Sequence, residues 1–425
     1  MGADGRIRVR LSVMMALVYS VQGSFWPLLS IHLRDLGVSE RSRGWIFATT
    51  AMASVAVPLG AGRLVDRLLP TQKLLSILYG LGSLVLAGLA AGLATTAGGL
   101  FAAFLLFWMI LAPSYTLSNS LAFRNLADPA RDFGRVRLWG TIGWMATGWF
   151  VSAVLAGMGA EQPGRGVPES LWIASALAVV TSLYCVTLPN TPPLVRDPVQ
   201  RSGFAEIASL ARRPGVAAYL VLVFGVGVTT PFVYQVMPTH LRSVGLDRSW
   251  VPTAMSLGQF PEIAALAALP WLIRRWGYPI TLGLGIAAYV VRFGSLALNP
   301  PLWLAVVGIP LHGVGVACFN IGGQVFMDGH APADRRAGAQ ALNTILGGGL
   351  GTLVGSMLAG ELVRLSPGNY GWVFLVPCGI DVALLILLWV AFRTRTAEPV
   401  VTCAPKPHLA VAVADETGAE LGSSL

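Results

Sequence analysis

The chain has 425 residues, of which 55% are hydrophobic and only 12% are charged, whereas about 25% of an average soluble domain is charged. The mean hydropathy is +0.67. A soluble protein of this length could not cover its surface with so few charges. The composition therefore excludes a soluble enzyme, a disordered protein and a disulfide scaffold, and it predicts an all-α polytopic membrane protein.

The formal net charge is +9, and in a soluble protein such an excess of basic residues would suggest nucleic-acid binding. Here the basic residues lie in short segments between apolar runs, and most of them fall in loops that are cytoplasmic if the N-terminus is inside. This bias predicts a multi-pass protein of the bacterial cytoplasmic (inner) membrane with both termini in the cytoplasm. Membrane lipids are its expected surroundings, without a nucleic-acid partner.

Twelve apolar segments are long enough to cross a bilayer as helices, which takes about 20 residues each. The first segment extends too far to be a cleaved signal peptide, so we interpret it as a retained span. In chain order the segments are approximately 11–33, 44–66, 74–94, 98–122, 138–159, 168–189, 216–238, 250–273, 279–298, 301–327, 339–363 and 370–392.

The longest internal polar segment, residues 190–214, contains four prolines and separates six spans from six others. This division predicts an N-terminal six-helix bundle over residues 1–189 and a C-terminal six-helix bundle over residues 215–392, joined by a cytoplasmic linker at 190–214. Two such bundles are the architecture of many secondary transporters. The polar tail, residues 393–425, is expected to be disordered and cytoplasmic.

Sequence motifs of enzyme chemistry are absent. The chain has no HExxH, GxSxG or Walker A run, and its four cysteines lack the spacing of a metal site or a disulfide framework. We therefore expect no catalytic residues, no cofactor and no metal. The glycines of the apolar run at residues 347–349 are interpreted as sites of close helix packing.

A charged motif follows the second predicted span. Gly62, Asp66 and Arg67 form a G-x-x-x-D-R pattern that resembles the loop signature of the major facilitator superfamily. The resemblance implies a conformational latch, in which Asp66 pairs with an arginine at a neighbouring helix end and holds one transporter state. An ordinary basic loop is the alternative interpretation.

The stretch FGRVRLWGTIGW at residues 133–144 resembles the R-x-W-G-T-x-G-[FW] motif of the nucleoside:proton symporter family. Residues 187–190, 256–262 and 319–326 are also similar to that family, so the resemblance extends over essentially all spans. It implies the major facilitator fold, with twelve helices in two six-helix bundles. It also implies alternating-access transport of a small polar solute, a nucleoside, together with protons.

Glu262 is the leading candidate for the proton-binding residue and also a candidate for substrate binding. At 1.5 Å per residue it lies about 17 Å from the cytoplasmic end of its span, and a lone carboxylate at that depth marks a functional site by default. The alternative is a structural ion pair with Arg292, which has a similar predicted depth in the next span. For Arg292 itself we expect a structural role.

Arg137, Thr141 and Trp144 lie on one helical face because they are spaced by four and three residues. By its position alone, Arg137 could be a basic anchor at the membrane surface, but the resemblance implies that it faces a central cavity. The three side chains offer a donor, a hydroxyl and an aromatic plane, which suit a nucleoside. For Trp144, simple packing remains an equal alternative to stacking on the base.

Several further polar residues within the spans are candidates for substrate binding, but each can equally join two helices. His312 is a candidate for proton coupling because histidine titrates near neutral pH, and a neutral histidine bonded to the backbone is the alternative. The remaining substrate candidates are Gln259, Asn119 and Asn320, followed by Gln22 and Trp26.

The chain departs from the family pattern at three positions. Ala317 stands where the family carries a carboxylate in the tenth span, and Pro231 and Tyr234 stand where its seventh span supplies glutamine and asparagine. Gln235 and His312 are the residues that can compensate. These departures leave two alternatives open: another cargo (an oligosaccharide, an aromatic acid or an exported drug) and a non-transporting membrane sensor. A monomer is expected.

Overall fold

The computed structural model describes residues 3–57, 69–158, 164–193, 214–331 and 336–393, and the described residues form helices joined by short loops. The first half contains α1 (Ala3–Phe25), η1 (Trp26–Leu28), α2 (Leu29–Asp35), α3 (Glu40–Ala56), α5 (Thr71–Ala90), α6 (Ala97–Asn125), α7 (Pro129–Gly157) and α8 (Pro168–Thr187). The second half contains α10 (Pro214–Thr229), η3 (Phe232–Val236), α11 (Met237–Ser243), η4 (Arg248–Trp250), α12 (Val251–Ser256), α13 (Gln259–Ala297), α14 (Leu302–Val307), α15 (Leu311–Gly315), η5 (Val316–Ile321), α16 (Gly322–His330), α17 (Arg336–Thr344), η6 (Ile345–Gly351), α18 (Thr352–Leu365) and α19 (Tyr370–Arg393).

Ten helical segments in the described part of the chain are long and apolar enough to cross a membrane. One of them, Arg248–Ala297, has 50 residues and is interrupted at Gly277, whose φ of 75° is unfavourable for residues with a side chain. Pro279 follows two residues later, and its ring cannot continue the preceding helix. The prediction of an all-α membrane protein is confirmed.

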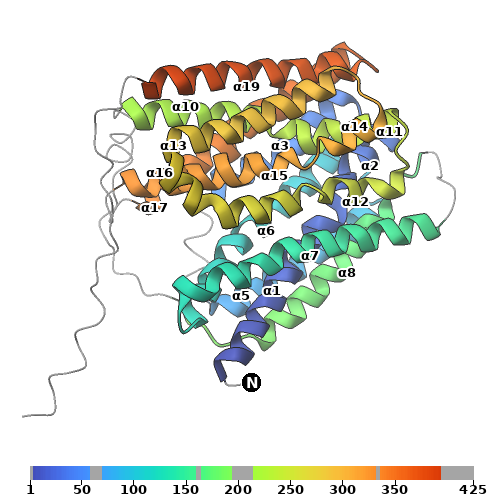
Figure 1. The fold of residues 1–425 in the computed structure, drawn as a ribbon. Helices are drawn as coiled ribbons and strands as arrows, with labels where there is room; N and C mark the ends of the chain where they lie inside the picture. The colour runs from blue at the N-terminus through green and yellow to red at the C-terminus, as the bar shows by residue number, and fades with distance from the viewer. Residues whose placement is uncertain (1–2, 58–68, 159–163, 194–213, 332–335, 394–425) are drawn as a thin grey trace, which may run out of the picture.

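The helices bury two hydrophobic clusters. One lies among the helices of the first half, with Phe25 and Phe104 at its centre, and the other lies mainly among those of the second half, with Phe293 and Phe374. Figure 1 shows the same division, with α1, α5, α7 and α8 in its lower part and α10, α13, α15 and α19 in its upper part. Val151 of α7 belongs to the second cluster, so the halves also share apolar contacts.

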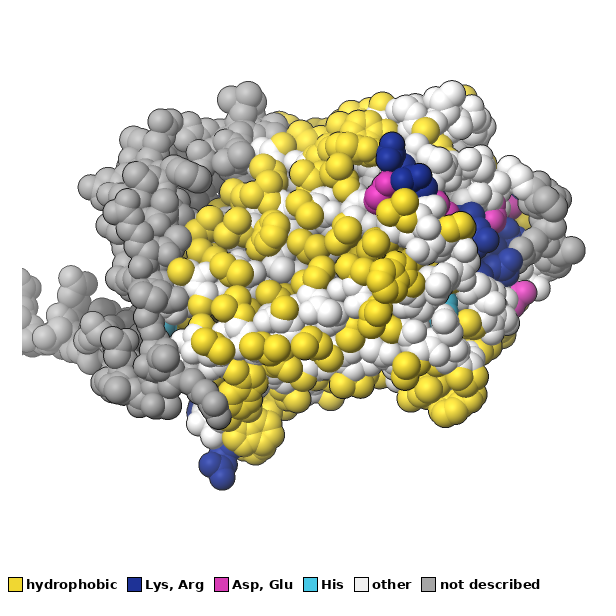
Figure 2. Space-filling view, turned by 90° about the horizontal axis from the view of Figure 1, so that it is seen from above, with side chains coloured by type: hydrophobic (Ala, Val, Ile, Leu, Met, Phe, Trp, Pro, Cys, Tyr) yellow, Lys and Arg dark blue, Asp and Glu magenta, His cyan; other side chains and the backbone are white. Residues whose placement is uncertain are grey.

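Large apolar side chains cover much of the outer surface. Leu84 is 69% exposed, Leu183 66% and Ile386 59%. Figure 2 shows a broad hydrophobic face, with the acidic and most of the basic side chains toward one end and a separate basic patch near the other. A continuous apolar surface of this extent is unfavourable in water and suits the hydrocarbon of a bilayer.

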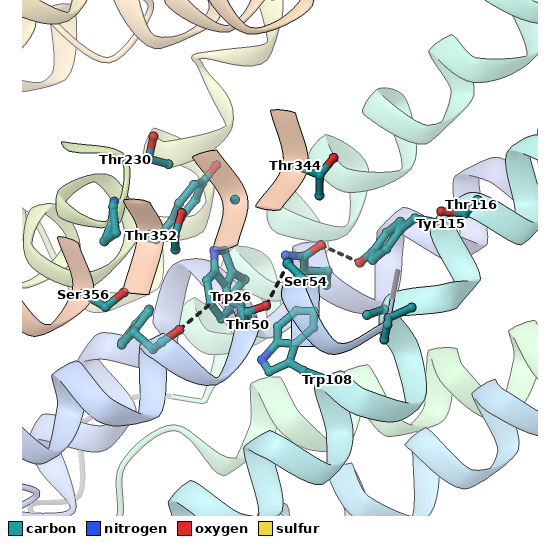
Figure 3. A pocket seen from close by; sticks show the side chains of 17 residues that line it. Trp26, Thr50, Ser54, Trp108, Tyr115, Thr116, Thr230, Thr344, Thr352 and Ser356 are labelled. Carbon is teal, nitrogen blue, oxygen red and sulfur yellow. Dashed lines mark hydrogen bonds between the residues drawn. The ribbon is translucent and has the colours of Figure 1, made fainter. Parts of the chain in front are cut away.

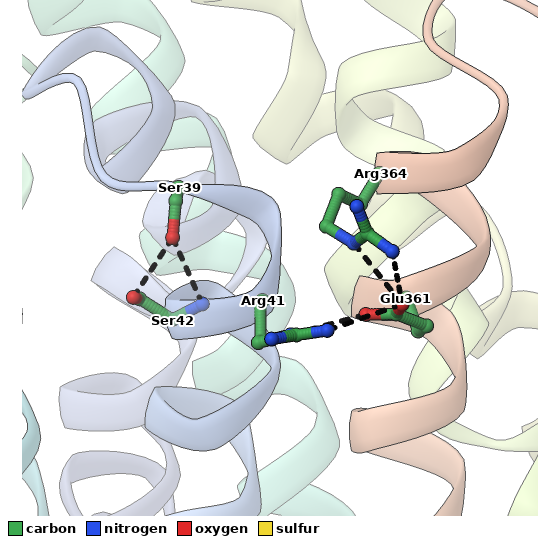
Figure 4. A network of polar contacts seen from close by, with 5 residues as sticks. All are labelled: Ser39, Arg41, Ser42, Glu361 and Arg364. Atoms are coloured by element: carbon green, nitrogen blue, oxygen red, sulfur yellow. Dashed lines mark hydrogen bonds and ion pairs between the residues drawn. The ribbon is translucent and has the colours of Figure 1, made fainter.

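The two halves are joined at the end of the molecule where α3 begins and α18 ends. There α3 and α18 cross so closely that a Cβ added at Gly44 would lie 2.7 Å from the carbonyl oxygen of Ser356. Beside this crossing Arg41 Nε pairs with Glu361 Oε2 at 3.2 Å, and Arg364 pairs with the same carboxylate (Figure 4). The structure is therefore closed at this end.

Candidate functional site: a central cavity

A cavity of about 400 Å³ lies between the two halves (Figure 3). Aromatic and hydroxyl side chains dominate its lining, and no charged side chain contributes to it among the described residues. The lining residues are Gln22, Trp26, Phe47, Thr50, Ser54, Val57, Trp108, Ala112, Tyr115, Thr116, Thr230, Pro231, Tyr234, Thr344, Gly348, Thr352 and Ser356. A cavity of this volume and character suits a small, uncharged, partly aromatic ligand.

Trp26 is at the centre of the aromatic part of the lining. Its ring lies 5.3 Å from that of Trp108 in an edge-on arrangement and 6.1 Å from that of Tyr234. Trp26 and Trp108 come from the first half and Tyr234 from the second, so the aromatic surface spans both. Pro27, directly after Trp26, is the second residue of the short helix η1, in which the chain of α1 tightens before α2. The local backbone thus presents the indole to the cavity.

The polar part of the lining consists of an amide and several hydroxyl groups. Tyr115 donates a hydrogen bond to Gln22 Oε1 at 2.6 Å, which fixes the orientation of the amide. Thr50 and Thr230 donate to backbone carbonyls of their own helices at 2.9 and 2.8 Å. Because these hydroxyl protons are engaged, their oxygen lone pairs remain available to accept hydrogen bonds from a ligand.

The predicted α7 face lies beside the cavity but does not line it. Arg137, Thr141 and Trp144 are half-buried on α7. The Arg137 guanidinium lies 4.1 Å from the ring centre of Tyr19, and the Tyr19 ring in turn lies 5.3 Å from that of Tyr115 in the lining. The Trp144 ring packs edge-on against Tyr234, with 6.2 Å between the ring centres. This arrangement is the one expected if Trp144 packs between helices and does not stack on a base. The Arg137 guanidinium is thus separated from the cavity by the Tyr19 and Tyr115 rings.

Glu262 lies at the start of α13, half-buried, where α13 meets α15. A Cβ at Gly313 of α15 would collide with the Glu262 backbone, so the two helices touch at this point. The carboxylate is close enough to Arg137 for the two charges to interact, and Tyr19 and Tyr234 lie in the same field. The charge of Glu262 therefore acts on Arg137 of α7 in the other half and on Tyr234, which lines the cavity.

The ion pair of Glu262 with Arg292, which was the alternative interpretation, is not present among the described residues. Arg292 is fully buried, and its Nη1 contacts His312 Nδ1 at 3.2 Å while its Nη2 contacts Met237 Sδ at 3.0 Å. A similar predicted depth does not place two side chains on facing sides of their helices. Arg292 faces the interior of the second half, and His312 is its partner.

The remaining candidates are scattered. Gln259 is buried one turn before Glu262, and Asn320 is half-buried in the π-helical turn η5. Asn119 is half-buried on α6, and its Oδ1 is buried without a hydrogen-bond partner. None of these three lines the cavity, whereas Gln22 and Trp26 do.

Some predictions lie partly or wholly outside the described residues. The latch residues Gly62, Asp66 and Arg67 are among these, as are most of the linker at 190–214 and nearly all of the tail at 393–425. Gln235, in contrast, is described: its amide donates to the Ser356 carbonyl at 3.0 Å, so it joins two helices and does not reach the cavity.

Sequence reasoning missed two features of the site. The first is the pair of tyrosines, Tyr19 and Tyr115, between Arg137 and the cavity. They were missed because they look like ordinary apolar positions within their spans. The second is Asp381, which is fully buried in α19. A signal for Asp381 was available, since it is the only acidic residue in the apolar segment 370–392 and an ionisable residue within a span indicates function.

Comparisons with known proteins agree with this architecture. A family model described as nucleoside H+ symporter matches residues 6–397. The chain is 30% identical to YegT of Escherichia coli K12 over 365 residues, 84% of either chain. It is 26% identical to the xanthosine permease of Escherichia coli K12 over 418 residues, 91% of this chain and 96% of the permease. A crystal structure of a mutant of the nucleoside transporter NupG shares the fold, with a TM-score of 0.82 at 23% identity, covering 91% of this chain and 100% of that one. The chain belongs to the nucleoside H+ symporter family and is a membrane transporter, not an enzyme.

Proposed function

We propose that the protein takes up a nucleoside together with protons by alternating access, and that the nucleoside binds in the central cavity. The observation that carries this proposal is the composition of the lining, in which both halves contribute aromatic rings and hydroxyl or amide groups, and in which the described residues include no charged side chain. A nucleoside combines a stacking base with a hydroxylated ribose and no charge. The xanthosine permease among the relatives supports the same substrate class.

Each part of the nucleoside has a suitable surface in the cavity. The base stacks against Trp26, with Trp108 and Tyr234 at its edges, because every nucleobase has an aromatic face that can stack on an aromatic side chain. The ribose hydroxyls donate to lone pairs of Thr50 and Thr230, and the Gln22 amide nitrogen donates in return. Because these groups come from both halves, a bound nucleoside bridges them.

Glu262 is the proposed proton-coupling residue. Two observations support this role: its charge interacts with that of Arg137 in the other half, and it acts on Tyr234, which lines the cavity. Protonation neutralises Glu262 and weakens the attraction between α13 and α7. The halves can then move apart at this contact once the proton and the nucleoside are both bound.

The membrane topology that we infer has twelve spans. The segment Arg248–Ala297 contributes two spans, because its break at Gly277 divides 50 residues into two helices, and α3 contributes one. We assign residues 1–189 and 215–392 to two six-helix bundles with both termini in the cytoplasm. In that orientation the closed end lies outside, and the structure represents an inward-facing state.

The proposal is tested by uptake of radiolabelled uridine, adenosine and xanthosine into proteoliposomes, with and without an inward proton gradient. We expect gradient-stimulated uptake of at least one of the three. If folded protein takes up none of them, a nucleoside is the wrong cargo. Uptake that ignores the gradient would retain the cargo and reject proton coupling.

Replacing Trp26 by alanine is expected to raise the KM for nucleoside by about 5- to 150-fold, because loss of base–aromatic stacking costs about 1–3 kcal/mol. Trp26→Phe retains a ring and should restore most of the affinity. Trp303→Ala is the matched control, since Trp303 is 66% exposed on the outer surface. A KM unchanged in Trp26→Ala would place the base elsewhere.

A further inference from the structure

Asp381 is an acidic residue buried within a membrane-spanning helix and outside the central cavity. It lies halfway along α19 and is fully buried. Thr229 of α10 donates a hydrogen bond to its Oδ1 at 3.1 Å, and its Oδ2 has no hydrogen-bond partner. A permanent carboxylate normally accepts several hydrogen bonds. This one accepts a single bond, which leaves the second oxygen available for a proton.

The groups that face Asp381 form a small polar cluster inside the second half. Thr229 of α10 is hydrogen-bonded to Asp381, and Arg292 and Tyr289 of α13 and Cys378 of its own helix lie close enough to interact with it electrostatically. Among the described residues Asp381 makes no ion pair, although the charge of Arg292 acts on it. Arg292 is instead bonded to His312 and Met237, and its Nε has no hydrogen-bond partner.

The Asp381 cluster reaches the cavity by two routes. Thr229 is the last residue of α10 and precedes Thr230 and Pro231, which line the cavity just before the π-helical turn η3. On the other side His312 contacts the cavity residue Tyr234 edge-on at 6.2 Å. A change in the hydrogen bonding of Asp381 therefore acts on the interrupted helix that carries part of the binding site.

We propose that Asp381 is a second proton-binding carboxyl of this transporter, which exchanges a proton while Arg292 shifts between Asp381 and His312. The proposal rests on proton-coupled uptake as the function. In the proton-free state the carboxylate attracts Arg292. In the protonated state Asp381 is neutral, its hydroxyl is free to bond elsewhere, and Arg292 returns to the His312 contact seen in the structure.

The experiment compares wild type with Asp381→Asn in proteoliposomes, measuring the proton-to-nucleoside ratio from the gradient that just balances uptake. We expect the ratio to fall by about one proton in Asp381→Asn, while exchange of internal for external nucleoside persists. Steady-state accumulation should then fall about tenfold for each pH unit of gradient, because each coupled proton contributes that factor. An unchanged ratio would overturn the proposal. Asp4→Asn removes an exposed carboxylate and serves as the control.

A merely structural charge pair is distinguished by the double variant Asp381→Asn/Arg292→Gln. If Asp381 only balances Arg292, removal of both charges restores the wild-type ratio, and the proposal is wrong. If Asp381 carries a proton, the double variant regains folding and exchange but keeps the lower ratio. Asp381→Asn alone can fail to fold, since it leaves the buried charge of Arg292 uncompensated, which is strongly destabilising. The double variant removes both charges, so the ratio can still be measured in that case.

A measurement without nucleoside separates this proposal from the proposed function. The Tm of purified wild type between about pH 5 and 8 should depend on pH more strongly than that of the double variant, because a proton-exchanging buried group links stability to pH. If wild type takes up no nucleoside but this difference is present, the cargo is wrong and the proton site stands. Equal pH profiles would reject the site.

Discussion

Replacing Glu262 by glutamine is expected to abolish proton-driven accumulation while nucleoside exchange continues. Glutamine retains the size of the side chain but cannot gain or lose a proton. The variant corresponds to the protonated state, in which the electrostatic attraction between Glu262 and Arg137 is weakened. At steady state the inside-to-outside nucleoside ratio should fall to about one, the value for an uncoupled carrier.

The measurement is accumulation under an inward proton gradient, followed by counterflow without a gradient in the same proteoliposomes. Glu169→Gln is a matched control, because Glu169 pairs with Arg165 at 3.1 Å at the start of α8, away from the cavity. Accumulation at the wild-type level in Glu262→Gln would contradict the coupling role. Loss of both accumulation and counterflow would instead indicate a role in binding the nucleoside.

Replacing Gly44 by valine is expected to hold the closed end open. The added Cβ would lie 2.7 Å from the Ser356 carbonyl oxygen, which is shorter than any normal contact, and both atoms belong to rigid helices. Overpacking of this kind costs about 1–3 kcal/mol. The cost arises only in the state in which α3 and α18 are in contact, so the population shifts toward the opposite state by about 5- to 150-fold.

The shift is measured by labelling a cysteine introduced at the cavity residue Thr50, with the native cysteines replaced. A membrane-impermeant thiol reagent is added from the side of the closed end, and Gly44→Val should accelerate labelling while it slows transport. Gly379→Val is the matched control, because a Cβ at Gly379 meets no atom within 4 Å. Equal labelling rates in the two variants would show that the crossing of α3 and α18 does not control access.

Residue composition was sufficient to predict the class of protein, and single motifs were sufficient to predict the family. The stretch at residues 133–144 predicts the nucleoside H+ symporter family, and the family model matches residues 6–397. The predicted depth of Glu262 in its span rests on helical rise alone and stays a prediction. These features depend on local chemistry or on distance along one helix, so the linear sequence is sufficient to predict them.

The cavity lining could not be predicted in the same way, because it depends on how helices rotate against one another. Arg137 of α7 and Glu262 of α13 do not line the cavity. Tyr19 and Tyr115 lie between Arg137 and the cavity, and Tyr234 is the lining residue on which the charge of Glu262 acts. Neither the rotation of α6 that presents Tyr115 nor that of α13 that turns Arg292 toward His312 is visible in the periodicity of nearly uniformly apolar spans.

The sequence by itself determined that this protein is an all-helical membrane transporter, because hydropathy acts along the chain and the family motifs are local. Only the tertiary structure decided that Trp26, Tyr115 and Tyr234 share one cavity and that Arg292 contacts His312 instead of Glu262. The physical reason is that packing between apolar helices depends on shape and small residues more than on polarity. Contacts such as that of Gly44 with Ser356 set the helix rotations that the polar side chains then follow.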